Sequence, residues 1–391
     1  MQSKTERNRQ QAIERHLLGE KPGSICASLG YTRMWFYKWL MRYKSGEQHW
    51  FKERSRRPVE NQNCTEQKVV EIVKFVRQSL YNADLFHGPQ AILWELEDKG
   101  IKPLPSERTI ARILAREGLT HRRTGRYEPK GTKYPNWPAQ SPGDVHQSDY
   151  IGPCYIRGEK AVRFYGLNSV DVATGRCATE PVLAKGGDRT VNAFWAIWLR
   201  LGIPRIQQFD NELVFFGSRR FPRGIGQLIR LCLWHDVEPC FIPVREPWRN
   251  PVVEKFNHHW LQGLLRKQEI LSVEDLKVKM LGFEQKHNSH YRYSKLKGKT
   301  PLQSLAACRK QLIFPSSEQP PHYPIPKPET GRYHFIRFIR SDARLDIFGE
   351  TFHVPSEAVY EYVRATVDVA NQKLTLFLDN TAIDEKQYFL R

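Results

Sequence analysis

Apolar residues recur at helical spacing in three short runs within residues 1–62. The first run, over residues 7–18, has apolar positions three and four apart and predicts an amphipathic helix. A second helix is expected to end before Gly30, because glycine readily adopts the left-handed conformation that closes a helix. Thr32 is placed to cap a third helix, which is basic and aromatic and has Phe36 on its apolar face. Three helices with a glycine turn before the last one are typical of a helix-turn-helix module.

The same kind of pattern returns in residues 63–122. Thr65 precedes a valine-rich helix, and a second amphipathic helix is expected to end at Gly100. Ser106 is a natural N-cap for a third helix, with Glu107 in its first turn. The apolar residues that this third helix would turn inward are Ile110, Ile113 and Leu114. We therefore predict a second helix-turn-helix module.

Residues 144–305 change to an α/β pattern. Three strand-like segments separated by turn residues are expected to form an antiparallel meander. An amphipathic helix over residues 188–202 then leads to a fourth strand, which such a crossover would make parallel to the first. A further helix and strand follow. Asn250 and Pro251 are placed as the N-cap and first residue of a long helix that reaches residue 271.

The remaining segments read as linkers and short strands. Residues 123–143 are rich in basic residues, proline and glycine, and predict a basic linker. Residues 306–331 are proline-rich and predict an extended spacer. Residues 332–391 alternate at period two, which favours a small all-β barrel that binds DNA or mediates assembly. The predicted fold class is therefore multidomain, with N-terminal all-α helix-turn-helix modules, a central α/β core and a C-terminal all-β barrel.

Charge and composition narrow the class of partner. The chain has 61 Lys and Arg against 42 Asp and Glu, a net charge of +19, which favours a polyanion because bound phosphates release counterions. Seven cysteines, odd in number and without a CxxC pair, favour reduced thiols over a disulfide framework. The N-terminus is polar, and no apolar run approaches the ~20 residues that cross a membrane. We expect a cytoplasmic, nucleoid-associated protein without a membrane partner.

Double-stranded DNA is the polyanion that the two helix-turn-helix modules favour, because the last helix of such a module lies in a major groove. The basic residues expected to contact DNA lie on the last helix of each module and in the linker; they are Arg33, Lys38, Arg42, Arg108, Arg112, Arg116, Arg122 and Arg123. The alternative for each module is a three-helix packing domain whose basic residues are merely solvated.

Three acids are the strongest candidates for chemistry. Asp149 and Asp210 fall within or directly after predicted strands, and Glu254 falls one turn into the helix that starts at Pro251. Carboxylates brought close together resist joint ionisation unless a cation neutralises them. Hard Mg²⁺ or Mn²⁺ binds a few carboxylates and keeps positions open for water and phosphate oxygens. Acids this far apart in sequence occur in many chains, so the three alone are weak evidence for a metal site. The residues that flank them are more informative.

The neighbouring residues resemble the integrase catalytic core superfamily, and within it the bacterial insertion-sequence transposases with an aspartate-aspartate-glutamate triad. The resemblance is carried by the segments VHQSDYIGP, FDNE, RNPVVEKFNHHW and, at residues 287–305, HNSHYRYSKLKGKTPLQSL. It implies a ribonuclease-H-like core that holds Mg²⁺ through Asp149, Asp210 and Glu254. It further implies cleavage at the ends of a mobile element and attack of the freed 3′-hydroxyl on target DNA. A homo-oligomer on DNA is implied as well, because two ends are processed.

Two features depart from this family. The second acid stands in Asp210-Asn211-Glu212, where the family often has Asp-Asn-Gly, so Glu212 could alter the loop or compete for metal. The spacing between Asp210 and Glu254 is also longer than the family's usual one. The extra residues are expected in FFGSRRFPRGIGQ, whose arginines, Arg219, Arg220 and Arg223, could contact DNA. A tolerated surface insertion is the alternative.

Other candidates and functions carry less weight. Asp171 is expected to be structural, His258 packed or solvated, and the irregular spacing of Cys232, His235 and Cys240 gives little support for zinc. Two alternative functions are a non-catalytic DNA-binding regulator derived from a transposase, and a ribonuclease-H-like nuclease that does not join DNA. Retention of three acids argues against the first, and two modules for reading DNA argue against the second.

Overall fold

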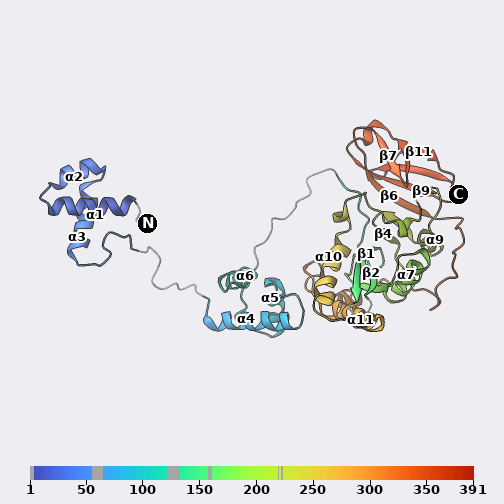
Figure 1. Cartoon of the computed structure of the whole chain (residues 1–391), viewed down its shortest axis with the longest axis horizontal. Helices are drawn as coiled ribbons and strands as arrows, with labels where there is room; N and C mark the ends of the chain where they lie inside the picture. The colour runs from blue at the N-terminus through green and yellow to red at the C-terminus, as the bar shows by residue number, and fades with distance from the viewer. Residues whose placement is uncertain (1–3, 55–64, 121–132, 157–160, 219, 222) are drawn as a thin grey trace. The chain divides into compact units, whose positions relative to one another are not determined.

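A computed structural model describes residues 4–54, 65–120, 133–156, 161–218, 220–221 and 223–391 (Figure 1). The chain forms two compact units, residues 1–66 and residues 67–391. No helix within the described ranges is both long and apolar enough to cross a membrane.

The first unit contains the three helices expected from the pattern, α1 (Lys4–Leu17), α2 (Pro22–Leu29) and α3 (Arg33–Lys44). Gly30 closes α2 at a φ of 74°, a conformation that glycine adopts without strain. The Thr32 hydroxyl accepts a hydrogen bond from the Trp35 N–H at 3.3 Å and so caps α3 as predicted. Ile13, Ile25 and Phe36 meet in the small apolar core of this unit.

The second unit begins with the second set of three helices, α4 (Gln67–Asn82), α5 (Pro89–Asp98) and α6 (Glu107–Arg116). Ser106 caps α6 by accepting a hydrogen bond from the Thr109 N–H at 3.2 Å. Val73, Ile92 and Ile110 are fully buried where the three helices meet. The predicted helical module is therefore confirmed in its secondary structure.

A mixed sheet organises the rest of the second unit. In the described residues it has nine strands in the order β11-β10-β9-β6-β5-β4-β1-β2-β3. The five strands of the core are β1 (Val145–Ile156), β2 (Val162–Asp171), β3 (Cys177–Val182), β4 (Ile206–Phe209) and β5 (Glu238–Phe241). The first three form the predicted antiparallel meander, and β4 lies parallel to β1 and to β5. This is the strand order of a ribonuclease-H-like core.

Helices cover both faces of this core sheet (Figure 1). The helices and short helical turns of the core are α7 (Gly187–Leu201), α8 (Leu213–Phe216), α9 (Gln227–Trp234), η1 (Pro247–Arg249), α10 (Pro251–Trp260), η2 (Leu261–Leu265), α11 (Val273–His290), η3 (Ser294–Leu296) and α12 (Pro301–Ala306). One apolar core lies between the sheet and α7 to α9, and a second lies between the sheet and α10 and α11. Phe194 and Trp260 are fully buried representatives of the two.

The helix that carries Glu254 is shorter than the sequence pattern suggested. We expected it to reach residue 271, but α10 ends at Trp260 and passes into the π-helical turn Leu261–Leu265. Gly263 in that turn lies against α11, where a Cβ atom would come within 2.8 Å of the Phe283 ring. The π-helical turn therefore packs tightly on α11 where the regular helix ends.

Residues 332–391 are all-β, as predicted, and their strands continue the core sheet. They form β6 (Arg332–Phe338), β7 (Arg344–Ile347), β8 (Glu350–His353), the turn η4 (Ser356–Ala358), β9 (Tyr362–Asp368), β10 (Lys373–Leu378) and β11 (Thr381–Gln387). β6 pairs in parallel with β5, through Cys240 with His334 and Phe241 with Phe335. The predicted separation of a barrel from the core is therefore corrected, because one sheet and one apolar core run through both.

Candidate active site

Asp149 and Asp210 lie level with one another at neighbouring parallel strands. Gln147 of β1 pairs with Gln208 of β4. Each acid stands two residues further along its chain, so the parallel register brings the two acids to the same height in the sheet. Asp149 also shares the face of Gln147, because side chains on a strand alternate between faces. This face of β1 is the one that packs against α10.

Glu254 reaches the same place from the first turn of α10, and a side chain of β1 holds that turn. Gln147 Oε1 accepts hydrogen bonds from the Val252 N–H at 2.9 Å and from the Val253 N–H at 3.4 Å. These N–H groups have no partner inside the helix, so an acceptor from outside stabilises the helix start. Gln147 is two residues before Asp149 on β1. It therefore ties the start of the helix that carries Glu254 to the strand that carries Asp149.

The predicted N-cap Asn250 has a different role. Its Nδ2 donates to the Ser148 carbonyl at 3.3 Å, and its Oδ1 accepts from Gln208 Nε2 at 3.2 Å. Asn250 therefore bridges β1 and β4 below the two aspartates, while Gln147 supplies the cap. Asn250 stands at the N-cap position and Pro251 starts the helix, as predicted, but Gln147 and not the Asn250 side chain accepts from the first N–H groups.

Burial and neighbouring negative charges raise the pKa values of all three acids. Burial, together with the charges of Asp210, Glu254 and Glu212, raises the pKa of Asp149 to about 7. Burial also raises the pKa of Asp210, with a contribution from Glu212. The pKa of Glu254 is raised by burial and then by the charge of Asp210. Carboxylates that disfavour each other's ionised form in this way create a demand for a cation.

A chain of hydrogen bonds leads across the sheet to Asp149. The Thr179 hydroxyl donates to Asn168 Oδ1 at 2.5 Å, and Asn168 Nδ2 donates to Asn257 Oδ1 at 2.7 Å. Asn257 Nδ2 then donates to Asp149 Oδ2 at 2.8 Å. Each donation fixes the orientation of the next amide. The chain therefore presents an N–H group to Asp149, which favours the ionised carboxylate.

The loop after β4 holds Asp210 through local and distant contacts. Asp210 Oδ1 accepts a hydrogen bond from the Glu212 N–H at 2.9 Å, which forms a tight turn. The Glu212 carboxylate is paired with Lys185. Asn211 Nδ2 donates to the Ile242 carbonyl at 2.6 Å, at the end of β5. The Glu212 that departs from the family pattern is thus engaged by a lysine at the wall of a cleft of about 800 Å³.

The three acids offer the kind of donor atoms that a divalent metal binds. Oxygen ligands from carboxylates with raised pKa values are the chemistry that Mg²⁺ prefers. Within the described ranges, no three His, Cys, Asp or Glu side chains are gathered closely enough to hold an ion as they stand. The charge of Asp210 contributes to the raised pKa of both Asp149 and Glu254, so the three carboxylates lie within electrostatic range of one another. The three carboxylates fit a divalent metal by the chemistry of their oxygen donors.

The other sequence candidates lie away from this space or are engaged in packing. Asp171 is opposite His146 in the sheet and accepts hydrogen bonds from the Gly143 N–H at 2.7 Å and the Thr174 hydroxyl at 2.6 Å. It organises the turn after β2, the structural role expected of it. Cys232 and Cys240 are buried in two different apolar clusters, on opposite sides of the sheet.

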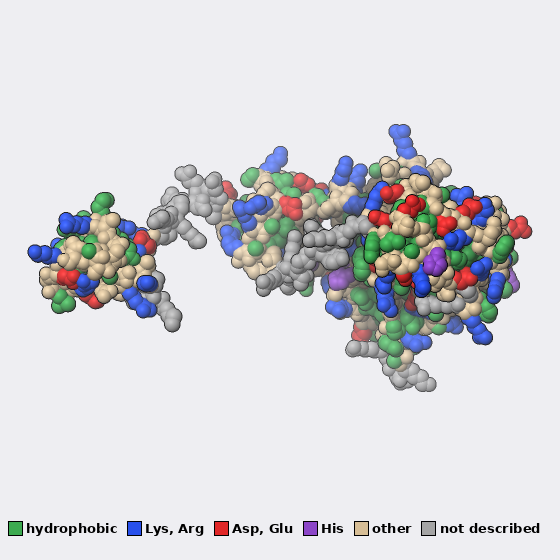
Figure 2. Space-filling view, turned by 90° about the horizontal axis from the view of Figure 1, so that it is seen from above, with side chains coloured by type: hydrophobic (Ala, Val, Ile, Leu, Met, Phe, Trp, Pro, Cys, Tyr) green, Lys and Arg blue, Asp and Glu red, His purple; other side chains and the backbone are tan. Residues whose placement is uncertain are grey.

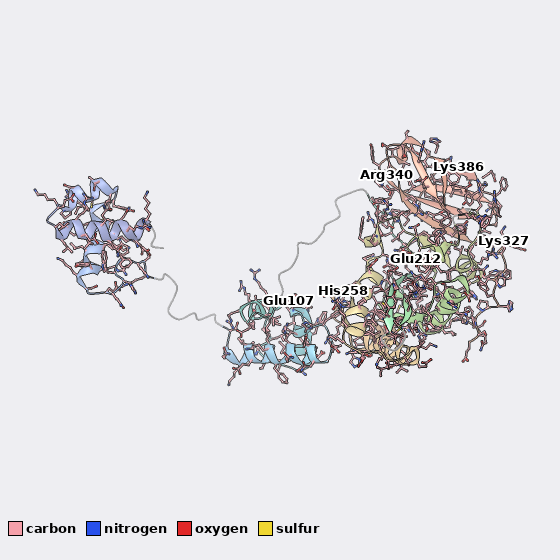
Figure 3. All side chains as sticks on the ribbon, viewed as in Figure 1. Glu107, Glu212, His258, Lys327, Arg340 and Lys386 are labelled. Carbon is pink, nitrogen blue, oxygen red and sulfur yellow. The ribbon has the colours of Figure 1, made fainter. Side chains whose placement is uncertain are left out.

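The two histidines of α10 have different surroundings. His258 is exposed, and Figure 3 labels it on the side of the core that carries α10. His259 packs against Phe86 and Tyr291, with ring centroids 4.7 and 6.3 Å away. Burial lowers the pKa of His259 to about 4, with smaller contributions from neighbouring positive charges. His259 is therefore a neutral packing residue.

The residues of the first module that were predicted to contact DNA lie on α3 and differ in their exposure and hydrogen bonding. Arg33 and Lys38 are exposed. Arg42 is held inside the module, where its Nε donates to Glu47 at 2.9 Å and its Nη1 donates to the Lys52 carbonyl at 2.8 Å. The helix also exposes large apolar side chains on its outer surface: Met34, Tyr37 and Met41.

The second module exposes its predicted basic stripe. Arg108, Arg112 and Arg116 are all exposed on α6, opposite the buried Ile110 and Ile113. In the face seen in Figure 2, Lys and Arg are spread over the surface among Asp and Glu. Two further predicted contacts, Arg122 and Arg123, lie outside the described residues.

The long insertion after Asp210 packs against the C-terminal segment. Arg223 Nε donates to Glu350 at 2.9 Å, and Phe216 stacks on Phe348 with centroids 4.2 Å apart. Arg220 is exposed, and Arg219 lies outside the described residues. The extra length thus provides packing surface for the strands that follow β5.

The sequence reasoning missed three polar residues that hold the acids: Gln147, Asn168 and Asn257. A signal existed for Asn257, because it follows Glu254 by three positions and so shares its helix face. Gln147 precedes Asp149 by two positions and so shares its strand face. Asn168 has no local signal, since only the pairing of β1 with β2 places it opposite Asp149.

Comparison with known proteins gives one family match. The Homeodomain-like domain family matches residues 3–50, which span the three helices of the first unit. No curated protein matches the chain. The homeodomain-like domain and the strand order of the core both support the resemblance to transposases and integrases.

Two solved structures are among those that match the chain. The HTLV-2 integrase catalytic core domain in complex with magnesium is 19% identical, covers 43% of this chain and 99% of its own, and has a TM-score of 0.33. The simian T-cell lymphotropic virus intasome in complex with the PP2A regulatory subunit B56 gamma is 14% identical. It covers 81% of this chain and 97% of its own, with a TM-score of 0.36. The fold assignment above rests on the chain's own strand order.

Proposed function

We propose that the chain is a metal-dependent DNA transposase that cleaves at the 3′ ends of a mobile element and joins them to target DNA. The observation that carries this proposal is the coupling of Asp149, Asp210 and Glu254. They come from β1, the loop after β4, and α10 of a ribonuclease-H-like core, and each has a raised pKa. Perturbed carboxylates in one place are a mark of a functional site.

Asp149, Asp210 and Glu254 would hold Mg²⁺, or Mn²⁺ in its place. When bound, such ions activate the attacking oxygen and stabilise the leaving oxygen of a phosphodiester. The chain's own residues prepare the ligands. Asn257 donates to Asp149, which favours its ionised form, and the turn at Glu212 fixes one oxygen of Asp210.

The two helical modules are the proposed means of recognising the element ends. The homeodomain-like match and the exposed basic residues of α3 and α6 support contact with double-stranded DNA. Because two ends must be processed together, we propose a homo-oligomer on DNA. A net charge of +19 supports binding to target DNA as well.

A strand-transfer assay with the full chain tests this function. The chain would be incubated with the element's terminal DNA and Mg²⁺, beside Asp149→Asn, Asp210→Asn and Glu254→Gln. These three variants should bind the ends with wild-type affinity and neither cut nor join. Removal of the metal with a chelator should stop the wild-type reaction, and added Mn²⁺ should restore it.

Each other outcome points to a defined alternative. Cutting without joining would identify a ribonuclease-H-like nuclease. Binding without cutting or joining by the wild-type chain would identify a non-catalytic regulator. Full activity in the three variants would remove Asp149, Asp210 and Glu254 from the chemistry.

A further inference from the structure

The C-terminal strands contact the loop that carries Asp210 and the segment that leads into the helix of Glu254. β6 lies next to β5, and β9 lies next to β6 (Figure 1). Two side chains of these strands, Arg337 and Tyr362, reach back over the carboxyl ends of β4 and β5. Neither a separate barrel nor a DNA-binding appendage would need such contacts.

Arg337 on β6 is buried, with 8% of its surface exposed. Its Nη2 donates to Asn211 Oδ1 at 2.8 Å, directly after Asp210. Its Nη1 donates to the Ile242 carbonyl at 2.9 Å, the same carbonyl that accepts from Asn211 Nδ2. A rigid guanidinium fork can hold these groups at once, which the single ammonium of a lysine cannot. Arg337 therefore locks the side chain of Asn211 to the end of β5.

Tyr362 on β9 holds the segment that leads into α10. Its hydroxyl donates to Glu246 Oε2 at 2.8 Å and accepts from Arg249 Nη2 at 3.0 Å. The Arg249 guanidinium also bonds Glu246 at 3.1 Å, and its carbonyl accepts from Gln208 Nε2 at 2.9 Å. Tyr362 is thereby connected to the turn before α10 and to β4.

We propose that the C-terminal strands are a positioning element of the active site, in which Arg337 sets the Asp210 loop and Tyr362 sets the entry to the Glu254 helix. This inference rests on the proposed function for its catalytic consequence. Its structural consequence can be measured alone. Arg337 and Tyr362 are positioning residues, because they act through Asn211, Glu246 and Arg249.

The test compares Arg337→Lys and Tyr362→Phe in the full chain with matched controls. Arg332→Lys makes the same change at the exposed first residue of β6, and Tyr360→Phe removes an exposed hydroxyl two residues from Tyr362. Hydrogen exchange, measured without DNA or metal, should speed up over residues 206–213 in Arg337→Lys. It should speed up over residues 245–252 in Tyr362→Phe. The controls should match wild type in both segments.

Kinetics supply the catalytic readout. Strand transfer at saturating DNA should fall roughly 100-fold in Arg337→Lys and about 5-fold in Tyr362→Phe, because small displacements of reacting groups are costly. The Mg²⁺ concentration for half-maximal rate should rise, and excess Mg²⁺ should partly restore the rate, while the Kd for DNA stays within about 2-fold. A purely structural defect would not respond to Mg²⁺.

Several results would overturn the inference. One is unchanged exchange over both segments in variants that remain folded, and another is wild-type rate and Mg²⁺ dependence despite faster exchange. If Arg337→Lys fails to fold, Asn211→Ala removes the acceptor of its Nη2 and should reproduce the exchange change over residues 206–213. A wild-type chain that neither cuts nor joins would defeat the proposed function, and hydrogen exchange would still decide the positioning role.

Discussion

Gln147 on β1 accepts hydrogen bonds from the first free N–H groups of α10, the shorter being that from Val252 at 2.9 Å. This contact joins the strand of Asp149 to the helix of Glu254, two residues from each acid. The separation of two candidate ligands therefore depends on a glutamine side chain. A cap that connects two elements acts on stability and on the geometry of the site together.

Replacing Gln147 by leucine should lower both stability and activity. Loss of the cap should reduce the free energy of unfolding by about 1 kcal/mol, the usual effect of removing a capping side chain. Strand transfer should fall roughly tenfold, because the first turn of α10 loses its link to β1. Denaturant unfolding and the strand-transfer rate would measure the two effects.

A matched control lies in α12, where Gln303 completes a capping box with Thr300. Gln303→Ala removes a comparable cap from a helix away from the acids, so it should lower stability and leave the strand-transfer rate unchanged. Equal losses of activity in Gln147→Leu and Gln303→Ala would show that Gln147 acts through stability alone.

Local patterns predicted the elements, and long-range pairing decided how the site is held. Alternation and turn residues gave the meander of β1 to β3, and helical spacing placed Glu254 near a helix start. The local signal placed Asn250 correctly at the N-cap position of α10, but the side chain that accepts from the first N–H groups lies 105 residues earlier in the chain. No spacing rule indicates a partner at that distance.

The C-terminal segment shows the same limit at a larger scale. Its alternation predicted strands, and the proline-rich segment before it predicted a separation. Parallel pairing of β6 with β5 depends on Phe335 and Phe241, whose stacked rings lie 5.4 Å apart. In the sequence, nothing distinguishes Arg337 from other basic residues in strands, because only this pairing places it against Asn211. The role of the segment could therefore not be predicted from its own pattern.

Asn257→Asp should be more damaging than Asn257→Ala. Asn257 donates to Asp149 at 2.8 Å, so an aspartate would replace a donor by a second negative charge. Loss of one donor to a catalytic group typically costs on the order of 100-fold in rate, and repulsion adds to this in the aspartate variant. Single-turnover cleavage rates at saturating DNA would measure the order of the two variants.

The hydrogen-bond chain behind Asn257 provides an internal check. Thr179→Val removes only the hydroxyl at the far end of the chain, which donates to Asn168. It should lower the cleavage rate in the same direction, by a few-fold, because the amides lose part of their fixed orientation. An Asn257→Asp variant with the rate of Asn257→Ala would contradict the assigned donor role.

His287 should make the fold less stable as the pH falls below about 6.5, the usual pKa of an unfolded histidine. Burial lowers the pKa of His287 to about 3, with the Asn288 side chain opposing this and the charge of His259 adding to it. Its ring contacts Cys177 Sγ at 3.2 Å and the Tyr293 hydroxyl at 2.6 Å. Between these pKa values the unfolded chain binds the extra proton, so stability falls with decreasing pH.

The slope from this one group should approach about 1.4 kcal/mol per pH unit in the middle of the window. Denaturant unfolding between pH 7 and pH 4 would measure it. His287→Gln removes the titration and should flatten the profile. His290→Gln, at an exposed position of the same helix, should retain the wild-type slope. Parallel profiles for His287→Gln and wild type would assign the acid sensitivity to other groups.

Arg108 and Arg112 should contribute to the salt dependence of DNA binding. They are exposed four residues apart on α6, opposite the buried Ile110 and Ile113, so one phosphate backbone can meet both. Each phosphate contact contributes about 0.9 to the slope of log K against log salt. The double variant Arg108→Ala, Arg112→Ala should therefore bind more weakly at low salt and lose about 1.8 from the slope. Fluorescence anisotropy across a salt series would measure this.

Lys99→Ala, which removes a lysine paired with Glu95 on α5, should keep the wild-type slope. An unchanged slope in the double variant would mean that α6 does not face the DNA.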